Sequence, residues 1–343
     1  MSDVLITGGA GFIGSNLAHR LLSEGYDVTI LDNLSRSGAA SNVQWLQEMH
    51  GTNGFQLIVA DLVDFEKLKS ATEGAQWIYH LAGQVAVTTS VQDPRADFED
   101  NALGTFNALE AARLVGDDPI FIYASTNKVY GGMNQIHIVE QDGRYKYLDW
   151  PDGIPESAGL DFHSPYGCSK GAGDQYTRDY HRIYGLRSVV MRQSCIYGYR
   201  QFGIEDQGWI AWFIISALKN HPITIYGDGK QVRDILFIED LLDAYVLAVN
   251  QIDTAAGQVY NVGGGPENTL AVWSEFGPIL EKLSGHSIPV EFKNWRPGDQ
   301  KVYTSNIEKI KREFGWSPKV SVNDGITRLY KWIKGNLELF AHL

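Results

Sequence analysis

A glycine-rich segment near the start of the chain limits its fold more than any other feature. The apolar run Val4–Ile6 leads into Thr7–Gly14, with the sequence TGGAGFIG, and a helical pattern follows. Gly9, Gly11 and Gly14 match the spacing that permits a tight turn and brings backbone N–H groups close to a diphosphate. No Gly-Lys-Ser/Thr follows these glycines, which excludes a P-loop. The segment therefore predicts a dinucleotide-binding strand–turn–helix.

The first half of the chain alternates apolar runs with helical patterns. Further strands are predicted over Val28–Leu31, Gln56–Val59, Trp77–Leu81, Ile120–Tyr123 and Ser188–Met191, and helices over Ser15–Ser23, Ala102–Leu114 and Ser169–Tyr184. This alternation is typical of parallel strands joined by right-handed crossovers, with helices on both faces. We expect an α/β fold: a Rossmann-type doubly wound parallel sheet over 1–190, which binds NAD, and a smaller α/β substrate-binding lobe over 191–343, with the chain free to cross between them.

Composition excludes several classes of function. The net charge of −12 over 343 residues argues against non-specific nucleic-acid binding, which needs a basic surface. The uncharged stretch Gln207–Leu218 is shorter than the roughly 20 residues of a membrane span, so we expect a buried or partner-facing helix. Cys168 and Cys195 are too few for a disulfide framework and lack metal-ligand spacing. We expect a cytoplasmic homodimer or homotetramer without metal, nucleic acid or membrane partners.

The ends of the early strands carry the candidate cofactor contacts. Asp32 follows the second strand, where a carboxylate accepts hydrogen bonds from the adenosine ribose and selects NAD, although Arg36 leaves NADP open. Asp61–Leu62 and Leu81–Gly83 follow the next two strands and either contact the adenosine half or only pack there. Cofactor contacts are predicted at Gly8, Gly11, Phe12, Ile13, Gly14, Asp32, Asn33, Arg36, Asp61, Leu62, Leu81, Ala82, Gly83, Tyr166 and Lys170.

Tyr166 and Lys170 lie four residues apart at the start of a predicted helix, a spacing that puts both side chains on one face. A phenol titrates near pH ~10 and is a poor base at neutral pH. A nearby lysine ammonium and a nicotinium charge would lower the pKa of the phenol. Ser125–Thr126 ends the fifth strand, where a hydroxyl can share the substrate oxygen with Tyr166. A surface pair is the simpler explanation of the spacing alone, but its position after the fifth strand favours catalysis.

These motifs together resemble the extended short-chain dehydrogenase/reductase family, which contains NAD-dependent nucleotide-sugar epimerases and dehydratases. The resemblance covers nearly the whole chain and extends to Asn101, Val129–Gly131, Arg192, Tyr197–Gly198, Val232–Asp234 and Arg296–Asp299. It implies NAD as cofactor, with Asn101 among its contacts, and a nucleotide sugar as substrate. It further implies that Thr126 and Tyr166 contact the reacting hydroxyl and that Lys170 holds the nicotinamide ribose.

The resemblance also implies a set of substrate contacts in the second half. Arg233 and Arg296 would bind the diphosphate of the sugar nucleotide, and Asp299 would bind its ribose. The alternative for the two arginines is a surface salt bridge. The family often has asparagine where Cys195 stands, a departure at a diphosphate contact. Other substrate contacts are predicted at Gln84, Thr126, Asn127, His163, Gln193, Ser194, Gln201 and Gln207. For His163, Gln193 and Gln201, the alternative is a purely structural role.

The residues after Thr126 narrow the reaction. Dehydratases of the family have Asp-Glu at this point, whereas Asn127-Lys128 stands here, so the elimination of water lacks its carboxylates. Ser125–Gly131 and Asp161–Gly171 resemble the 2-epimerases that act on CDP-hexoses, which implies inversion of C2 through a 2-keto sugar with NAD bound throughout. The alternatives are a UDP-hexose 4-epimerase, an oxidoreductase that releases NADH, and a non-catalytic NAD-binding sensor.

Overall fold

A computed structural model describes residues 3–296 and 299–341. Its contacts divide the chain into two compact units, each built from three separate segments. Unit 1 comprises Met1–Val129, Ser164–Arg192 and Leu242–Tyr260, and unit 2 comprises Tyr130–His163, Gln193–Leu241 and Asn261–Leu343. The sequence predicts one main boundary near residue 190, and the structure adds boundaries at 129, 163, 241 and 260.

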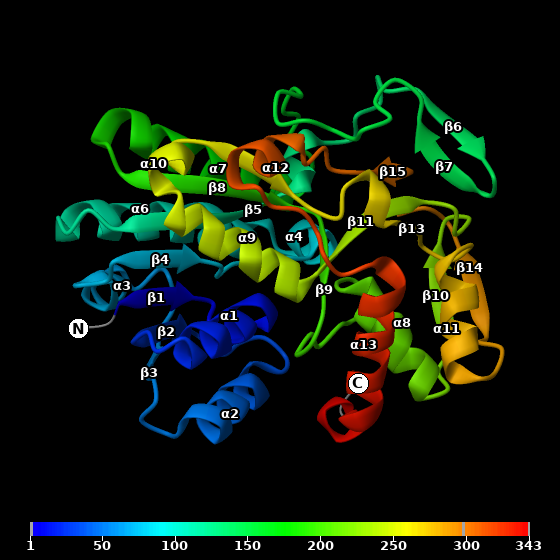
Figure 1. Ribbon diagram of the computed structural model, residues 1–343, viewed down its shortest axis with the longest axis horizontal. Coiled ribbons are helices and arrows are strands. Elements are labelled where there is room, and N and C mark those ends of the chain that lie inside the picture. The colour runs from blue at the N-terminus through cyan, green and yellow to red at the C-terminus, as the bar shows by residue number, and fades with distance from the viewer. Residues whose placement is uncertain (1–2, 297–298, 342–343) are drawn as a thin grey trace. The chain divides into compact units, whose positions relative to one another are not determined.

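Unit 1 is built on a seven-stranded sheet (Figure 1). Its strands, in spatial order, are β12 (Val259–Val262), β8 (Arg187–Gln193), β5 (Ile120–Thr126), β4 (Trp77–His80), β1 (Val4–Thr7), β2 (Val28–Asp32) and β3 (Gln56–Val59). The pairings from β5 through β4, β1 and β2 to β3 are parallel. This confirms the predicted doubly wound sheet. The strand order reverses between β1 and β4, and folds of this kind bind ligands at the carboxyl ends of the strands beside such a reversal.

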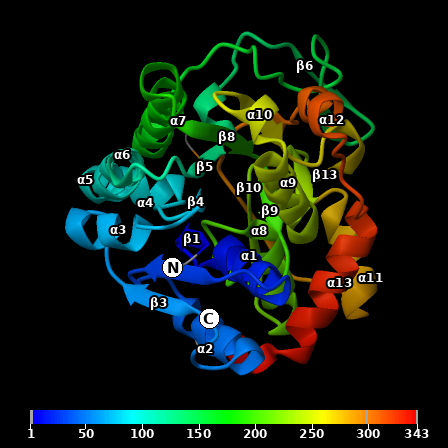
Figure 2. The ribbon, with the colours of Figure 1, turned by 60° about the vertical axis from the view of Figure 1, so that its left-hand side comes forward.

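Helices cover both faces of this sheet. Figure 2 shows α3, α6 and α7 on one face and α1, α2 and α9 on the other. The helical elements are α1 (Phe12–Ser23), α2 (Ala39–His50), α3 (Phe65–Thr72), α4 (Val87–Gln92), α5 (Pro94–Asp97), the π-helix η1 (Phe98–Leu103), α6 (Gly104–Val115), α7 (Ser164–Tyr184), α9 (Ile238–Asn250) and α10 (Ile252–Ala255). The apolar stripes of α3, α6 and α7 bury Leu68, Leu109 and Tyr180 against strand residues such as Phe121. This burial fixes α7, the helix that carries Tyr166 and Lys170.

A buried ion pair joins α7 to two strands of the sheet. Arg192 on β8 donates from Nε and Nη2 to the two carboxylate oxygens of Asp174, at 2.8 and 2.9 Å. Ser125 on β5 donates to the same carboxylate at 2.8 Å. The Asp174 and Arg192 side chains are 0% and 2% exposed, so each depends on the other for the compensation of its charge. The pair therefore fixes α7 relative to β5 and β8.

Unit 2 contains smaller sheets. A four-stranded sheet joins β9 (Cys195–Tyr197), β11 (Val232–Phe237), β13 (Thr269–Ala271) and β15 (Val302–Tyr303); β10 (Ile223–Tyr226) pairs with β14 (Val290–Lys293), and β6 (Ile138–Gln141) with β7 (Arg144–Tyr147). Its helical elements are α8 (Trp209–Leu218), α11 (Phe276–Ser284), α12 (Glu308–Phe314), α13 (Val322–Gly335), η3 (Pro266–Asn268) and η4 (Leu337–Phe340), and η2 (Asn127–Tyr130) spans a unit boundary. Pro297 and Gly298 of the predicted phosphate-binding segment lie outside the described residues.

The uncharged stretch near residue 210 forms helix α8 and is buried, as the sequence predicts. Ile210, Phe213 and Ile214 of this helix are at most 5% exposed. The rings of Trp209 and Phe213 pack against Phe276 of α11. In the part of the chain that the structure describes, no helix combines the length and the apolar character needed to cross a membrane.

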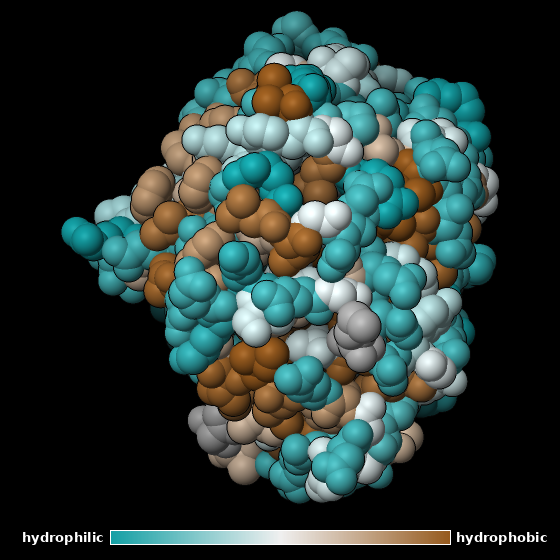
Figure 3. All heavy atoms as spheres, turned by 90° about the vertical axis from the view of Figure 1, so that its left-hand side faces the viewer, coloured by the Kyte–Doolittle hydropathy of each residue, from teal (hydrophilic) through white to brown (hydrophobic). Residues whose placement is uncertain are grey.

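Helices α6 and α7 expose several large hydrophobic side chains. Phe106 and Leu114 on α6 are 38% and 47% exposed, and Tyr176, Ile183 and Tyr184 on α7 are 48%, 65% and 55% exposed. The Phe106 and Tyr176 rings meet edge to face, with their centroids 5.8 Å apart. Figure 3 views the molecule from the left-hand side of Figure 1 and shows hydrophobic side chains interspersed with hydrophilic ones on that face.

The Arg192–Asp174 pair generates a stability prediction. We expect Arg192→Met to lower the free energy of unfolding by about 3–5 kcal/mol, because it leaves the Asp174 carboxylate buried and unpaired. Arg187→Met is a matched control, since Arg187 lies on the same strand and its partner Asp118 is 66% exposed. The control should cost about 1 kcal/mol or less. Urea unfolding of both variants measures the difference, and equal losses would contradict the role of the buried pair.

Candidate active site

The glycine turn between β1 and α1 has the geometry of a diphosphate-binding loop. Gly8 has a left-handed φ of +71°, and a Cβ there would lie 2.7 Å from the Ala82 nitrogen. A Cβ on Gly14 would lie 2.2 Å from the Gly8 oxygen. A Cβ on Gly11, in contrast, would meet only the Gly8 oxygen within 4 Å, at 3.2 Å. Neighbouring backbone atoms thus leave no room for a side chain at Gly8 or Gly14, whereas Gly11 has free space around it. This arrangement fits the approach of a dinucleotide to the backbone at the start of α1.

The predicted adenosine contacts cluster at the ends of β2 and β3. Asp32 accepts hydrogen bonds from the Ala10 and Leu34 nitrogens, at 3.0 and 2.8 Å, which ties the glycine turn to the end of β2. Burial raises the pKa of Asp32, and these two bonds oppose the rise. A carboxylate has about four acceptor sites, so two remain for a ribose. Asn33 donates to Asp61 at 2.8 Å, which brings two more of the predicted residues together.

The loop after β4 is held by Asn101. The Asn101 amide donates to the Gln84 carbonyl at 3.0 Å and to Asp97 Oδ1 at 3.0 Å. Gly83 adopts a φ of +152°, and a Cβ there would lie 2.4 Å from Asn101 Oδ1. The Gln84 side chain, a predicted substrate contact, donates to the Ala86 carbonyl of its own loop. Asn101 therefore supports the segment that contains the predicted cofactor contacts after β4.

His80 is a buried, neutral connector beneath the site. Its Nδ1 lies 2.8 Å from the Thr7 hydroxyl and its Nε2 lies 3.1 Å from the Thr105 hydroxyl, so both ring nitrogens have partners. Burial, together with the charge of Lys170, lowers the pKa of His80 to about 3. A neutral imidazole there links β1 to α6 without competing for the carboxylates around Lys170.

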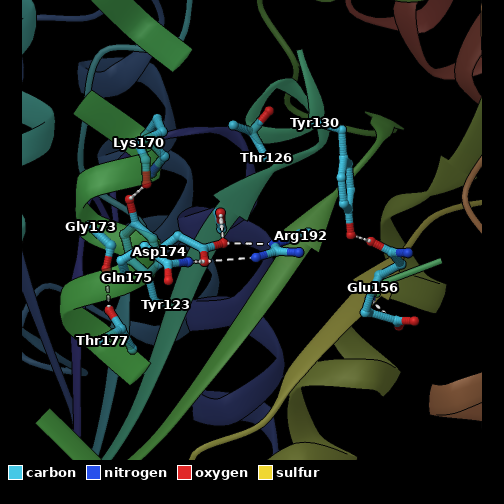
Figure 4. Close-up of polar contacts among 12 residues, drawn as sticks. Tyr123, Thr126, Tyr130, Glu156, Lys170, Gly173, Asp174, Gln175, Thr177 and Arg192 are labelled. Atoms are coloured by element: carbon cyan, nitrogen blue, oxygen red, sulfur yellow. Dashed lines mark hydrogen bonds and ion pairs between the residues drawn. The ribbon is translucent and has the colours of Figure 1, made fainter. Parts of the chain in front are cut away.

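The predicted catalytic residues come together in unit 1. The Thr126 side chain at the end of β5 hydrogen-bonds to the Tyr166 side chain on α7. Lys170, one helical turn after Tyr166, places its ammonium 4.4 Å from the centroid of the Tyr123 ring. Tyr123 in turn donates to the Lys170 carbonyl at 3.2 Å (Figure 4). The structure thus brings a hydroxyl, a phenol and an ammonium to adjoining positions on β5 and α7.

Burial dominates the proton affinity of this pair. It raises the pKa of Tyr166 to about 12; the Thr126 hydrogen bond lowers that pKa, Asp97 raises it and Arg36 lowers it. Burial lowers the pKa of Lys170 to about 7, against the raising effects of Asp174 and Asp97. With a pKa of about 12, Tyr166 is a phenol at neutral pH in the polypeptide alone. That Lys170 and a nicotinium charge lower this pKa stays a prediction.

Two predicted diphosphate-binding arginines lie in unit 2. Arg233 on β11 is 8% exposed and donates to Asp299 Oδ1 at 2.6 Å. Arg296 pairs with Asp206 at 2.9 Å and stacks its guanidinium 3.9 Å from the centroid of the Tyr226 ring. Both arginines are thus paired with carboxylates in the chain. Because each pair is at least partly accessible, a diphosphate can exchange with the carboxylate as the partner of the guanidinium.

The remaining predicted substrate contacts occupy varied environments. Ser194 donates to the Asp234 carbonyl at 3.1 Å, and Gln201 donates to the Ile196 carbonyl at 3.2 Å while its Oε1 is buried without a hydrogen bond among the described residues. His163 is exposed and pairs with Asp161 at 3.0 Å. The others are Asn127, which is buried and accepts from the Thr126 hydroxyl, Gln193, which is buried, and Gln207, which is half-buried.

Two carboxylates of the site, Asp97 and Asp174, did not stand out in the sequence. Asp97 is a buried carboxylate whose charge raises the pKa of both Tyr166 and Lys170. Asp174 also acts on Lys170 and pairs with Arg192. Two signals were available, since Asp97 lies four residues before Asn101 and Asp174 four residues after Lys170, each on a shared helical face. Ser125, considered with Thr126 as a substrate contact, donates instead to Asp174.

The family model for GDP-mannose 4,6-dehydratase matches residues 5–329. The chain belongs to this family. It is 45% identical over 338 residues to CDP-paratose 2-epimerase of Salmonella typhi, with 96% of this chain and 98% of that protein covered. It is 32% identical to a putative UDP-glucose 4-epimerase of Methanocaldococcus jannaschii, with 97% and 99% covered.

Solved structures of this family have the same fold. The UDP-glucuronic acid 4-epimerase of Bacillus cereus, solved with UDP-glucuronic acid and NAD, superposes with a TM-score of 0.83 at 30% identity, over 97% of this chain and 99% of that one. A dTDP-glucose 4,6-dehydratase of Streptomyces venezuelae, a double mutant solved with NAD, superposes with a TM-score of 0.84 at 29% identity, over 98% of each chain. The family resemblance expected from the sequence is confirmed.

The glycine turn generates a prediction on cofactor binding. We expect Gly8→Ala to reduce the dinucleotide content of the purified protein at least tenfold, because the new methyl group collides with the Ala82 backbone at a left-handed φ. Gly25→Ala is the matched control, since Gly25 has a φ of +91° with nothing within 4 Å of its Cβ position. It carries the same backbone strain without the collision. Chromatography of the released nucleotide measures both, and full occupancy in Gly8→Ala would refute the expected steric effect.

The Thr126–Tyr166 hydrogen bond generates a prediction on proton affinity. Because this bond lowers the pKa of Tyr166, we expect Thr126→Val to move its ionisation to higher pH. The readout is the Cζ resonance of ¹³C-labelled Tyr166 in the NAD-bound protein, assigned with Tyr166→Phe. Ser125→Ala, which removes the neighbouring hydroxyl bonded to Asp174, should leave the midpoint in place. An unchanged midpoint in Thr126→Val would show that the bond does not tune Tyr166.

Proposed function

We propose that this protein inverts C2 of a CDP-hexose of the paratose/tyvelose or glucose type. It is an NAD-dependent nucleotide-sugar epimerase. The juxtaposition of Thr126, Tyr166 and Lys170, in the same unit as the glycine turn, supports the redox chemistry. The 45% identity to CDP-paratose 2-epimerase across nearly the whole chain supports the substrate and the carbon, and it is the observation that carries the proposal.

The chain's own residues handle the proton. Tyr166 takes the proton of the C2 hydroxyl, and Thr126 hydrogen-bonds at the same oxygen. The Lys170 ammonium lies one turn away and would hold the nicotinamide ribose. NAD, when bound, would supply the acceptor for the C2 hydride and the donor for its return, after the 2-keto sugar has turned to present its opposite face. Tyr166 then gives its proton back to the oxygen, so the sugar is inverted and no redox equivalent leaves the enzyme.

Asn127 separates this reaction from dehydration. It follows Thr126 directly, is buried and accepts a hydrogen bond from the Thr126 hydroxyl at 3.3 Å. An amide neither donates nor accepts a proton as an acid or base at neutral pH, so the general acid–base pair needed to expel water is missing from this position. Without dehydration, the oxidised sugar either takes the hydride back, as we propose, or leaves the enzyme as a keto product.

The nucleotide diphosphate is assigned to unit 2. Arg233 and Arg296 bind its phosphates and Asp299 its ribose, and each arginine exchanges its present carboxylate partner for phosphate oxygens. The cofactor contacts are those predicted from the sequence, with Asp32 on the adenosine ribose and Asn101 supporting the loop after β4. The other assigned substrate contacts are Gln84, Asn127, His163, Gln193, Ser194, Gln201 and Gln207.

Self-association and a cytoplasmic location complete the proposal. The exposed hydrophobic side chains of α6 and α7 supply an apolar surface suited to a second copy of the chain, as a homodimer or homotetramer. Cys168 and Cys195 are not joined in a disulfide, and Cys168 is exposed, which suits a reducing compartment. Light scattering coupled to size-exclusion chromatography measures the oligomeric state directly.

The reaction proposal is tested by following which carbon inverts. We expect incubation with CDP-hexoses, without added NAD, to give a product whose proton NMR coupling constants show inversion at C2. UDP- and GDP-hexoses should react at least tenfold more slowly. Inversion at C4 of a UDP-hexose would establish the 4-epimerase instead, and accumulation of free NADH would establish a simple oxidoreductase.

Tyr166→Phe tests the assigned proton carrier. We expect it to lower the rate of epimerisation by about 10²–10⁴-fold, because the phenol that carries the proton is gone. Bound NAD should remain at the wild-type level. Tyr176→Phe removes a hydroxyl from the exposed part of the same helix and should retain full activity. Activity of Tyr166→Phe within a few-fold of wild type would remove Tyr166 from the mechanism.

A further inference from the structure

The Lys170 ammonium lies over an aromatic ring that the proposed mechanism does not use. Its Nζ is 4.4 Å from the centroid of the Tyr123 ring, within the range of a cation–π contact. Lys170 is 6% exposed, so little water surrounds the charge. The negative face of the ring therefore stabilises an ammonium that has lost most of its hydration.

This contact leaves N–H donors of the ammonium unused. Within 3–296 and 299–341, Lys170 Nζ makes no hydrogen bond and no ion pair. An ammonium has three donors, and a ring occupies only the side of the cation that faces it. A carboxylate at ion-pair distance would instead take up donors and compensate the charge. Lys170 thus keeps donors for a ligand although it is almost fully buried.

Two carboxylates and two neutral groups complete the surroundings of Lys170. The charges of Asp174 on α7 and Asp97 on α5 raise its pKa, against the lowering effect of burial. His80 on β4 and Tyr166 on α7 are uncharged at neutral pH. In the described parts of the chain, none of these four side chains bonds to the ammonium. They influence its charge without contacting it, whereas the aromatic ring contacts it directly.

Tyr123 is itself firmly held. It is 0% exposed on β5, and its hydroxyl donates to the Lys170 carbonyl at 3.2 Å (Figure 4). Its ring stacks on that of His80, its partner in register on β4, with centroids 5.9 Å apart and planes 19° apart. The lysine side chain, in contrast, is a flexible four-carbon stem. The rigid ring therefore supports the mobile cation.

Gly173 on α7 makes the close approach of Tyr123 possible. A Cβ at this position would collide with the Tyr123 hydroxyl oxygen and would lie 3.1 Å from Thr105 Cγ2. Glycine weakens the interior of a helix relative to alanine. Gly173 lies three residues after Lys170 and thus on the same side of α7. The helix accepts a weaker residue at the point where the Tyr123 hydroxyl needs room.

We propose that Tyr123 is a positioning residue whose π face holds the Lys170 ammonium so that its free N–H donors are presented to the hydroxyls of the nicotinamide ribose. This inference rests on the proposed function, which makes that ribose the partner of Lys170. A ring face is uncharged and accepts no proton, so it fixes the cation without neutralising it. A carboxylate in its place would compete with the ribose for the same donors.

The direct test varies the charge of the ring face at nearly constant shape. Tyr123 is replaced by phenylalanine and, through stop-codon suppression, by phenylalanines with one, two or three fluorines, which withdraw electrons from the face. The readout is the titration midpoint of Lys170 in the nucleotide-bound protein, from the Cε resonance of ¹³C-labelled lysine, assigned with Lys170→Arg. The midpoint should fall with each fluorine, by about 0.5–1.5 units over the series, or roughly 3- to 30-fold in the ammonium–amine equilibrium.

Two ordinary variants separate the ring from the hydroxyl. Tyr123→Phe keeps the ring and should keep the wild-type midpoint. Tyr123→Leu removes the ring and should lower the midpoint at least as far as three fluorines do. If Tyr123→Phe shifts the midpoint as far as Tyr123→Leu, the hydroxyl supports Lys170 and the proposal is overturned. If Tyr123→Leu does not fold, the fluorinated series, which keeps the shape of the ring, still decides.

Phe121 is the matched control position. It lies on the same strand, is 0% exposed and packs against the His80 ring at 5.7 Å, but no cation lies over it in the described residues. Fluorines introduced at Phe121 should leave the Lys170 midpoint unchanged. An equal shift from both positions, or a constant midpoint along the Tyr123 series, would overturn the role of the ring face.

The rate at which bound NAD leaves the protein is the second readout. Because the ring presents donors to the ribose, release should become faster in the same order as the midpoint falls. A shifted midpoint with unchanged release would contradict the presentation of the donors to the ribose. Neither measurement needs a sugar, so both decide the role of Tyr123 even if no CDP-hexose is epimerised. Epimerisation at C2 with a constant midpoint would remove Tyr123 and leave the proposed function standing.

Discussion

The cost of holding a charged lysine away from water governs the chemistry of unit 1. Burial lowers the pKa of Lys170 to about 7 and raises that of Tyr166 to about 12, so both lose much of their charged form at neutral pH. Asp174 and Asp97 oppose this effect at Lys170, and the Thr126 hydrogen bond opposes it at Tyr166. Residues from β5, α5 and α7 therefore set the pKa values of Tyr166 and Lys170. A change in the packing of these three elements changes both pKa values.

That electrostatic balance depends on a rigid frame. The Arg192–Asp174 pair and the Ser125 hydroxyl fix α7 against β5 and β8. His80 joins the end of β1 to α6, and Asn101 joins the loop after β4 to Asp97. One set of buried polar contacts thus runs from Thr7, directly before the glycine turn, through His80, Thr105 and Asn101 to Asp97 at the end of α5.

The sequence predicted the elements with strong local signals. The glycine turn, the strand-end Asp32 and the Tyr166–Lys170 spacing were all readable because each depends on neighbours within one strand–turn–helix or one helical turn. Asp97 and Asp174 were not assigned, since their importance arises from packing between α5, α7 and β8, which spacing alone does not reveal. The division into discontinuous units was likewise beyond local patterns, because the chain crosses between them at points without a distinctive composition.

In the proposed reaction, a hydride leaves C2 of the sugar and returns to the same carbon. The most direct test supplies a CDP-hexose carrying deuterium at C2, in ordinary water, and examines the epimer by mass spectrometry and NMR. We expect the inverted product to keep its deuterium at C2, because the hydride that leaves this carbon is the one that returns to it. Loss of the label to solvent would contradict hydride return, and inversion at another carbon with the C2 label untouched would contradict the assignment of the reaction to C2.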